Sequence, residues 1–242
     1  LFLGAGSVIH AMSDEQDMRK MGGIYTLLPG TYAVMWIGSL ALAGIPFFAG
    51  YYSKDLIIEA AFAAGEGMGR YAYVMGMAAA LLTAFYSWRL LFMTFHGRAR
   101  ADEKVMAHVH ESPKVMMIPL LLLAVGAIFA GFFGYDAMVG EHRADFWGDS
   151  IFVMPANDVI EAAHHVSAMV KYSPVGLALI GILVAWWWYV KNPTIPGRVA
   201  GLHREAYLFL LNKWYFDELY DLVFVKPARW LGYLLWKGGD GK

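Results

Sequence analysis

Long stretches without a charged side chain constrain this chain more than any other feature of its sequence. Asp, Glu, Lys and Arg are all missing from residues 21–53, 115–133 and 173–190, and residues 71–95 contain only Arg89. A helix needs about 20 predominantly apolar residues to cross the hydrocarbon core of a bilayer. The sequence therefore predicts several membrane-spanning helices.

Composition supports this interpretation and excludes other classes of protein. Hydrophobic residues make up 59% of the chain and charged residues 16%, against about 45–50% and about 25% in soluble domains. The net charge of −1 provides no basic field for binding nucleic acid. Because the chain has no Cys, it has no disulfide, no cysteine nucleophile and no cysteine-ligated iron–sulfur cluster. We therefore expect contact with the lipid bilayer and no nucleic-acid partner.

The fold class that follows is an all-α membrane protein: a transmembrane helix bundle with one discontinuous helix, followed by an amphipathic lateral helix. The chain begins inside an apolar stretch without Met, so we expect it to be the C-terminal part of a longer protein. The predicted segments are the end of a truncated transmembrane helix over 1–11, a discontinuous transmembrane helix over 29–64, and transmembrane helices over 71–95, 115–135 and 173–190.

The remaining segments are predicted from their charges. Residues 202–236 mix large apolar side chains with charges, which is typical of an amphipathic helix along a membrane face. The 96–114 loop and the segment after residue 190 are rich in Lys and Arg, whereas the 136–172 loop is acidic. Since cytoplasmic loops carry an excess of Lys and Arg, we expect residues 12–28 and 96–114 on the cytoplasmic side and 136–172 on the outer side.

The discontinuous helix is predicted from its length and its helix breakers. An unbroken helix over 29–64 would be roughly 50 Å long at about 1.5 Å per residue, well beyond the hydrocarbon thickness of roughly 30 Å. Pro46 lacks a backbone donor, and Gly44 and Gly50 flank it, so the helix is expected to break there. Broken membrane helices are tolerated where they line polar cavities, and transport sites tend to lie in such cavities.

Lys54 and Asp55 follow this break and are the candidate catalytic residues, acting by proton transfer. A lysine at the centre of a membrane costs at least ~2.5–3.5 kcal/mol, so such a residue is a functional hypothesis by default. A movable ion partner would switch its protonation on and off. Asp55 is displaced by about 100° around a helix from Lys54 and need not be that partner. The alternative is a lysine at a helix end that extends to the membrane surface.

Other polar residues give weaker signals. A hydrated proton path is a possible role for His10, Ser53, Thr83, Tyr86 and Ser87. We predict no metal site, because the His108–Glu111 and His164–His165 groups lack further ligands at a suitable spacing. Both groups are predicted to be solvated loops, and no cofactor-binding residue is predicted anywhere in the chain.

Four segments resemble a known family. Residues 1–11, LFLGAGSVIHA, resemble the end of a signature helix in the antiporter-like subunits of respiratory complex I, and residues 14–23 are similar to the loop that follows it. Residues 50–55, GYYSKD, resemble that family's broken-helix motif, with tyrosines where phenylalanines are usual. Residues 212–221, NKWYFDELYD, resemble the start of the long lateral helix in the L (ND5) type of subunit.

This resemblance implies a proton-translocating subunit of the membrane arm of NADH:quinone oxidoreductase. Lys54 would be a central proton-transfer group in a hydrated half-channel, beside the acid at Asp55. FMN, iron–sulfur clusters and quinone are expected in other subunits, with none in this chain. The expected partners are other membrane-arm subunits, especially the adjacent antiporter-like subunit. The expected location is the bacterial inner membrane, or the mitochondrial inner membrane if the protein is organellar.

Two alternatives stay open. The chain could belong to the large subunit of a multi-subunit Na⁺/H⁺ antiporter, or it could be a passive scaffold of the membrane arm. The Ser53-Lys54-Asp55 sequence and the predicted lateral helix favour the oxidoreductase over the antiporter.

Overall fold

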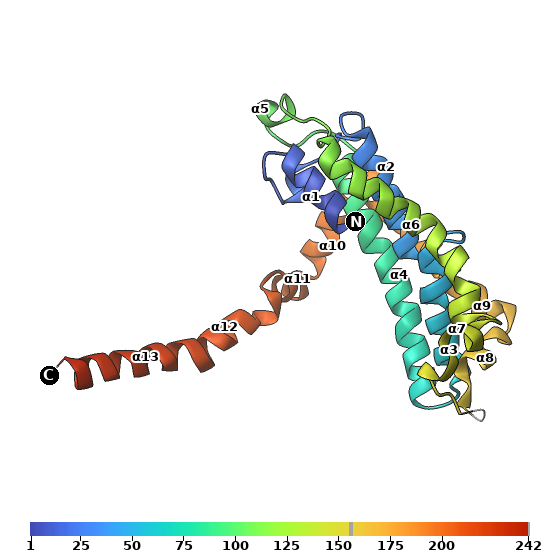
Figure 1. Ribbon diagram of the computed structural model, residues 1–242. Coiled ribbons are helices and arrows are strands. Elements are labelled where there is room, and N and C mark those ends of the chain that lie inside the picture. Colours follow the sequence, from blue (N-terminus) through green and yellow to red (C-terminus); the bar gives the residue numbers. More distant parts are fainter. Residues whose placement is uncertain (155–156, 242) are drawn as a thin grey trace. The chain divides into compact units, whose positions relative to one another are not determined.

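The computed structural model describes residues 1–154 and 157–241, and these residues form helices, turns and loops without a β-strand. The chain divides into two compact units, Leu1–Asn192 and Pro193–Lys242. The main helices of the first unit are α1 (Phe2–Ala11), α2 (Pro29–Ala43), α3 (Leu56–Ala63), α4 (Met68–Phe95), α6 (Lys114–Val139) and α9 (Ala168–Trp186), shown in Figure 1. The predicted all-α bundle is therefore confirmed.

Three helices of the described residues are long and apolar enough to cross a membrane, namely α4, α6 and α9 with its π-helical extension to Lys191. Each begins earlier than the sequence predicts, and α6 and the extended α9 also end later. Pro119 and Pro174 lie inside α6 and α9 rather than at their starts. Each is within the first two turns, where few hydrogen bonds of the helix are interrupted.

The longer spans shorten the loops between them, and both loops contain short helices. The acidic loop starts only at Gly140 and holds α7 (Arg143–Trp147) and α8 (Val159–His164). The 96–113 loop holds α5 (Glu103–Met106). Asp136 and Lys171, at the ends of the predicted acidic loop, are therefore helical residues of α6 and α9.

The packed interior lies where α1, α2, α4 and α9 meet. Trp36 and Trp88 pack edge to face with ring centroids 4.5 Å apart, and Leu91 and Phe95 are fully buried beside them. Close packing of α4 on α9 depends on small residues, since a Cβ on Gly181 would lie 2.5 Å from the carbonyl oxygen of Leu81. Small residues at such contacts are typical of membrane helices, whose association relies on close backbone approach.

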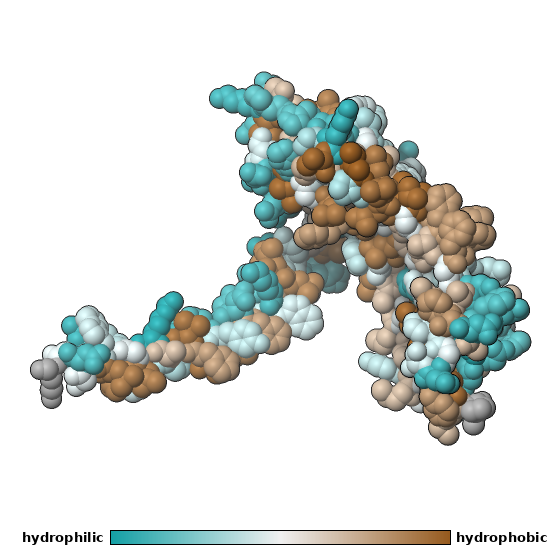
Figure 2. Space-filling view, in the orientation of Figure 1, coloured by the Kyte–Doolittle hydropathy of each residue, from teal (hydrophilic) through white to brown (hydrophobic). Residues whose placement is uncertain are grey.

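The surface of α6 is the opposite case, because most of its side chains are exposed. Figure 2 shows this hydrophobic surface over the middle of the bundle. The exposed residues include Leu121, Leu122, Leu123, Phe129, Phe132 and Phe133. A soluble protein rarely exposes so large an apolar surface, so this face fits lipid or a neighbouring membrane subunit.

Residues 12–28 and the 96–113 loop lie together at one end of the first unit. The backbone N–H of Gly23 donates to the carbonyl of His96 at 3.2 Å. Arg100 donates to the carbonyl oxygens of Met18, at 3.1 Å, and Arg19, at 2.9 Å. The two loops that we expect on the same side of the membrane thus occupy the same end of the bundle, and α7 and α8 occupy the other (Figure 1).

The second unit is a series of helical segments, α10 (Ile195–Leu202), α11 (Arg204–Leu211), α12 (Phe216–Tyr220) and α13 (Lys226–Leu235). It starts earlier than predicted because Pro196 sits in the first turn of α10, where a missing N–H leaves no bond unmade. A kink at residues 213–215 interrupts it, with φ of 62° at Trp214. Beyond the kink, π-helical turns join α12 to α13 and extend the helix to Asp240.

This second unit has the expected amphipathic composition. Charged pairs such as Lys213–Asp217, at 3.0 Å, alternate along it with exposed aromatic residues. Figure 2 shows hydrophobic and hydrophilic side chains next to each other along α11 to α13. Large exposed rings on such a helix favour a membrane surface or a protein neighbour.

Candidate functional site

The predicted break in the second span is present. Helix α2 ends at Ala43, and Gly44 adopts a left-handed conformation with φ of 74°. Residues 44–48 are non-helical, and after residues 49–50 a π-helical turn over Tyr51–Asp55 leads into α3. Glycine closes helices in this conformation at little cost, and Pro46 cannot continue the ladder of hydrogen bonds.

Lys54 reaches back across this break to the end of α2. Its Nζ donates a hydrogen bond of 2.5 Å to the carbonyl oxygen of Ala43, and it lies 3.7 Å from Oδ1 of Asp55. The last carbonyl groups of a helix carry a partial negative charge, which stabilises a cation placed there. The ammonium group is therefore held by a helix terminus and a carboxylate, and it does not extend along a helix end to the surface.

Two glycines make room for this arrangement. A Cβ on Gly44 would lie 2.5 Å from both Cε and Nζ of Lys54 and 3.2 Å from Oδ1 of Asp55. A Cβ on Gly50 would overlap with the carbonyl oxygen of Ala41. The glycines that predict the break in the sequence thus also bring its two halves together.

Asp55 is the most deeply buried charged residue of the site. Its side chain is 2% exposed, and neither carboxylate oxygen has a hydrogen-bond partner among the described residues. Burial of a carboxylate without a hydrogen-bond partner is costly. An ionisable residue buried in a membrane segment is by default a candidate for a functional site.

A polar cavity of about 160 Å³ lies next to Asp55. Its lining includes Glu59, which is 5% exposed, and Lys171 from α9. The complete lining is Tyr51, Tyr52, Asp55, Leu56, Glu59, Tyr135 and Lys171. Sequence analysis did not select Glu59, although its position four residues after Asp55 places both on one helix face.

Of the predicted proton-path residues, Ser53 adjoins Lys54 in the chain, and none of them contacts the Lys54 ammonium or the Asp55 carboxylate through a polar group in the part of the chain that the structure describes. The buried hydroxyl of Ser87 has no hydrogen-bond partner within residues 1–154 and 157–241. The ring of His10 lies 6.1 Å from that of His110, measured between ring centroids. Ser53 and Tyr86 are exposed and Thr83 is half-buried, and their place in a path stays a prediction.

Glu111 is predicted to lie in a solvated loop, but its half-buried carboxylate is bonded to the start of α2. Its carboxylate accepts hydrogen bonds from the N–H of Gly30, at 2.7 Å, and from the N–H and hydroxyl of Thr31. Helix α2 has no side-chain cap of its own, because its N-cap residue is Leu28. A residue 80 positions away therefore caps the N-terminus of α2, at the end opposite Lys54. The helix dipole stabilises a negative charge at this end.

No group of three or more His, Cys, Asp or Glu side chains suited to a metal ion occurs within residues 1–154 and 157–241. The imidazole Nδ1 of His108 is 2.7 Å from the carbonyl oxygen of Lys104. Likewise, Nδ1 of His110 is 3.0 Å from the carbonyl oxygen of Glu111. These contacts are consistent with local loop structure.

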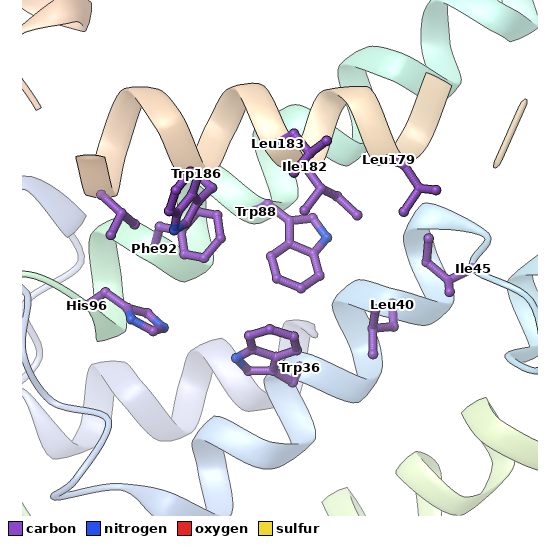
Figure 3. A pocket seen from close by; sticks show the side chains of 11 residues that line it. Trp36, Leu40, Ile45, Trp88, Phe92, His96, Leu179, Ile182, Leu183 and Trp186 are labelled. Carbon is purple, nitrogen blue, oxygen red and sulfur yellow. The ribbon is translucent and has the colours of Figure 1, made fainter. Parts of the chain in front are cut away.

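A second cavity, of about 470 Å³, lies between α2, α4 and α9 (Figure 3). Its lining is apolar and aromatic apart from His96, whose Nε2 is 2.8 Å from the hydroxyl of Tyr32. This cavity is larger than the one beside Asp55 but contains no Lys, Asp or Glu. Of these two cavities, only the smaller one beside the helix break is lined by Lys, Asp and Glu side chains.

The sequence of this chain is similar to those of membrane subunits of NADH:quinone oxidoreductase. The profile of a family described as "NADH:quinone oxidoreductase/Mrp antiporter, TM" matches residues 1–83. The chain is 43% identical to NADH-quinone oxidoreductase subunit L of Rhodobacter capsulatus, with 100% of the chain and 43% of the relative covered. It is 41% identical to NADH-ubiquinone oxidoreductase chain 5 of Marchantia polymorpha, with 96% of the chain and 35% of the relative covered.

A third relative, NADH-quinone oxidoreductase subunit L of Neisseria meningitidis, is 41% identical, with 99% of the chain and 39% of the relative covered. The chain thus spans less than half the length of each of these relatives. The similarity extends beyond the family profile and includes the second unit.

Proposed function

Because this chain belongs to the family of antiporter-like membrane subunits of NADH:quinone oxidoreductase, we propose that it is a proton-translocating part of that enzyme's membrane arm. Lys54 would act as a protonation switch in a hydrated half-channel. The observation that carries this proposal is the placement of the Lys54 ammonium between the last carbonyl of α2, at 2.5 Å, and the Asp55 carboxylate, at 3.7 Å.

The Lys54–Asp55 pair can hold its proton in two ways that have the same net charge. With Lys54 protonated and Asp55 ionised, the pair is neutral overall, and the end of α2 adds favourable negative potential. Transfer of the proton from Nζ to the carboxylate gives two neutral groups, which a low-dielectric environment also tolerates. Because neither state leaves a net charge in the membrane, a small change in the surroundings is enough to move the proton.

The rest of the enzyme's chemistry is assigned to other subunits. We expect FMN, iron–sulfur clusters and quinone there, since this chain has no Cys to ligate a cluster. Its partners would be other membrane-arm subunits, especially the adjacent antiporter-like subunit, together with lipid. The chain is a membrane protein of the inner membrane, as its apolar spans and its relatives indicate.

One alternative is a subunit of a multi-subunit Na⁺/H⁺ antiporter, since the family profile includes such proteins. The relatives that match nearly the full chain are named as oxidoreductase subunits, which favours the enzyme. A passive scaffold is the other alternative, and the buried charge at the helix break argues against it.

Replacement of Lys54 tests the proposal. Lys54→Ala is introduced into the full-length subunit, and NADH:quinone turnover and proton uptake are measured in inverted membrane vesicles. We expect proton uptake per assembled complex to fall by about tenfold or more, a modest loss for a positioned proton-transfer group. The matched control is Lys104→Ala, because Lys104 is exposed on α5.

Normal proton uptake by Lys54→Ala at normal assembly would exclude the switch and favour the scaffold. The antiporter would be favoured if neither variant showed NADH-driven proton uptake and Lys54→Ala, but not Lys104→Ala, lost Na⁺-dependent proton exchange. Both measurements use the same vesicles, so one preparation separates the three functions.

A further inference from the structure

We propose that Glu59, together with Lys171 of α9, is the next proton-transfer site after Asp55, and that it carries protons toward the end of the bundle formed by α7 and α8. This inference rests on the proposed function of Lys54 and Asp55. It adds a second carboxylate, Glu59, to the proton path and gives the direction in which protons leave Asp55.

The first argument is the placement of Glu59 relative to Asp55. The two residues are four positions apart, which puts their Cβ atoms about 5–6 Å from each other on one helix face. Asp55 is 2% exposed and Glu59 is 5% exposed. Two carboxylates buried side by side in a membrane segment are costly to hold ionised together, so protons are expected to be shared between them.

The second argument is the cavity that joins the two carboxylates. Its volume of about 160 Å³ is enough for on the order of five water molecules at ~30 Å³ each. Water in it would donate hydrogen bonds to the two Asp55 oxygens, which lack hydrogen-bond partners among the described residues. The lining combines two carboxylates, one ammonium group and three tyrosines, and a polar cavity of this kind holds water whereas an apolar one stays dry.

The third argument is that polar groups continue beyond the cavity. Tyr135, which lines it, has its hydroxyl 3.1 Å from Nε2 of His164 on α8. His164 is half-buried, and its neighbour His165 is exposed. The path from Asp55 through Glu59 thus reaches the loop end of the bundle through groups that can donate and accept protons.

The transfer step conserves charge and atoms. The O–H bond of protonated Asp55 breaks, a cavity water accepts that proton and releases another, and an O–H bond forms on Glu59. Asp55 is left as a carboxylate that can take the next proton from Lys54. Lys171 then favours the ionised form of Glu59, so the neutral acid releases its proton toward Tyr135, His164 and bulk water.

Substitution of Glu59 in the full-length subunit within the assembled enzyme tests the proposal. We expect Glu59→Gln to lower proton uptake per complex by about tenfold or more, and Glu59→Asp to restore a substantial part of it. Glu66→Gln is the matched control, because it removes the same charge from a residue that is exposed in the turn between α3 and α4. The contribution of Glu59 to the infrared band of buried carboxylic acids should also be lost in Glu59→Gln and remain in Glu66→Gln, while the contribution of Asp55 remains in both.

If Glu59→Gln lowers the amount of assembled enzyme, a second variant tests whether Glu59 carries protons. Lys171→Gln keeps the carboxylate but removes the nearby positive charge, so Glu59 holds its proton more strongly. The pH dependence of proton uptake should then shift to higher pH, which loss of a purely structural contact would not cause. An unchanged pH profile at normal assembly would overturn the proposal.

The outcomes separate this inference from the proposed function. If Lys54→Ala abolishes uptake while Glu59→Gln behaves like Glu66→Gln, Glu59 is not a proton carrier and the role of Lys54 stands. If Lys54→Ala is also normal, the proposed function itself fails. If both variants lose uptake and both controls keep it, the two proposals are supported together.

Discussion

Replacement of Gly44 by alanine would test whether the helix break positions Lys54. Gly44 has φ of 74° and closes α2. A Cβ at this residue would lie 2.5 Å from Nζ and Cε of Lys54. The substitution therefore changes no charge and removes no polar group, but it prevents the Lys54 side chain from lying where it does.

The expected magnitude follows from two contributions. A left-handed conformation costs a residue with a Cβ roughly 1–2 kcal/mol. Displacement of Lys54 removes a hydrogen bond that involves a charged group, worth about 1.5–3 kcal/mol. Since about 1.4 kcal/mol is a factor of ten in an equilibrium, loss of that bond alone lowers the population of the positioned Lys54 by about 10- to 10²-fold.

Proton uptake in inverted vesicles is the assay, normalised to the amount of assembled enzyme. We expect Gly44→Ala to reduce uptake by about tenfold or more, as the loss of the Lys54 hydrogen bond requires. Gly126→Ala is the control, because Gly126 lies inside α6 and a Cβ there has no neighbour within 4 Å. Alanine is favoured over glycine in a helix interior, so this variant should assemble and transport normally.

Wild-type uptake by Gly44→Ala, at wild-type assembly, would refute the reasoning. It would mean either that Lys54 functions from another position or that the break adjusts without cost. A loss of assembly in Gly44→Ala alone would instead assign the glycine a folding role. Addition of Lys54→Ala, which removes both crowded atoms, should then restore assembly in the double variant.

Two further predictions concern the ends of the bundle. Glu111→Ala should destabilise the start of α2 by about 1 kcal/mol, as expected for a lost helix cap, and hydrogen exchange at Thr31 should accelerate while exchange in α9 stays unchanged. The carboxylate of Asp136 accepts a hydrogen bond of 2.6 Å from Nδ1 of His142, and this bond raises the pKa of His142 above its usual range. The contact is therefore complete below pH about 6.5 and weakens as the pH rises through the raised pKa. Exchange at the N–H of Glu141, corrected for its intrinsic pH dependence, should accelerate over that range in the native protein and show no such step in His142→Gln.

Much of this protein can be predicted from its sequence because the signals are local. The spans follow from the length of uncharged stretches, since an apolar helix must match the thickness of a bilayer. The break follows from Gly44 and Pro46, which act on the backbone wherever they occur. Lys54 stands out because charge is scarce in its surroundings.

Predictions fail where distant residues decide. Glu111 lies in a polar segment that is typical of a loop, yet it caps a helix about 80 positions earlier in the chain. The sequence predicts that Lys171 belongs to an acidic loop, but it lies in α9 and lines a cavity with Glu59. No pattern in either segment alone indicates these contacts, because they arise only when segments far apart in the sequence pack together.

The sequence by itself determined that this chain spans a membrane, that one helix breaks and that a lysine follows the break. Hydrophobicity and backbone chemistry act over a few residues, and for that reason they can be predicted from the chain alone. The tertiary structure decided what the lysine touches, because the Ala43 carbonyl, Asp55 and the cavity beside Glu59 and Lys171 come from segments up to 128 positions apart, between residues 43 and 171. Burial then gives these few charges their effect, because a low-dielectric surrounding strengthens every interaction between them.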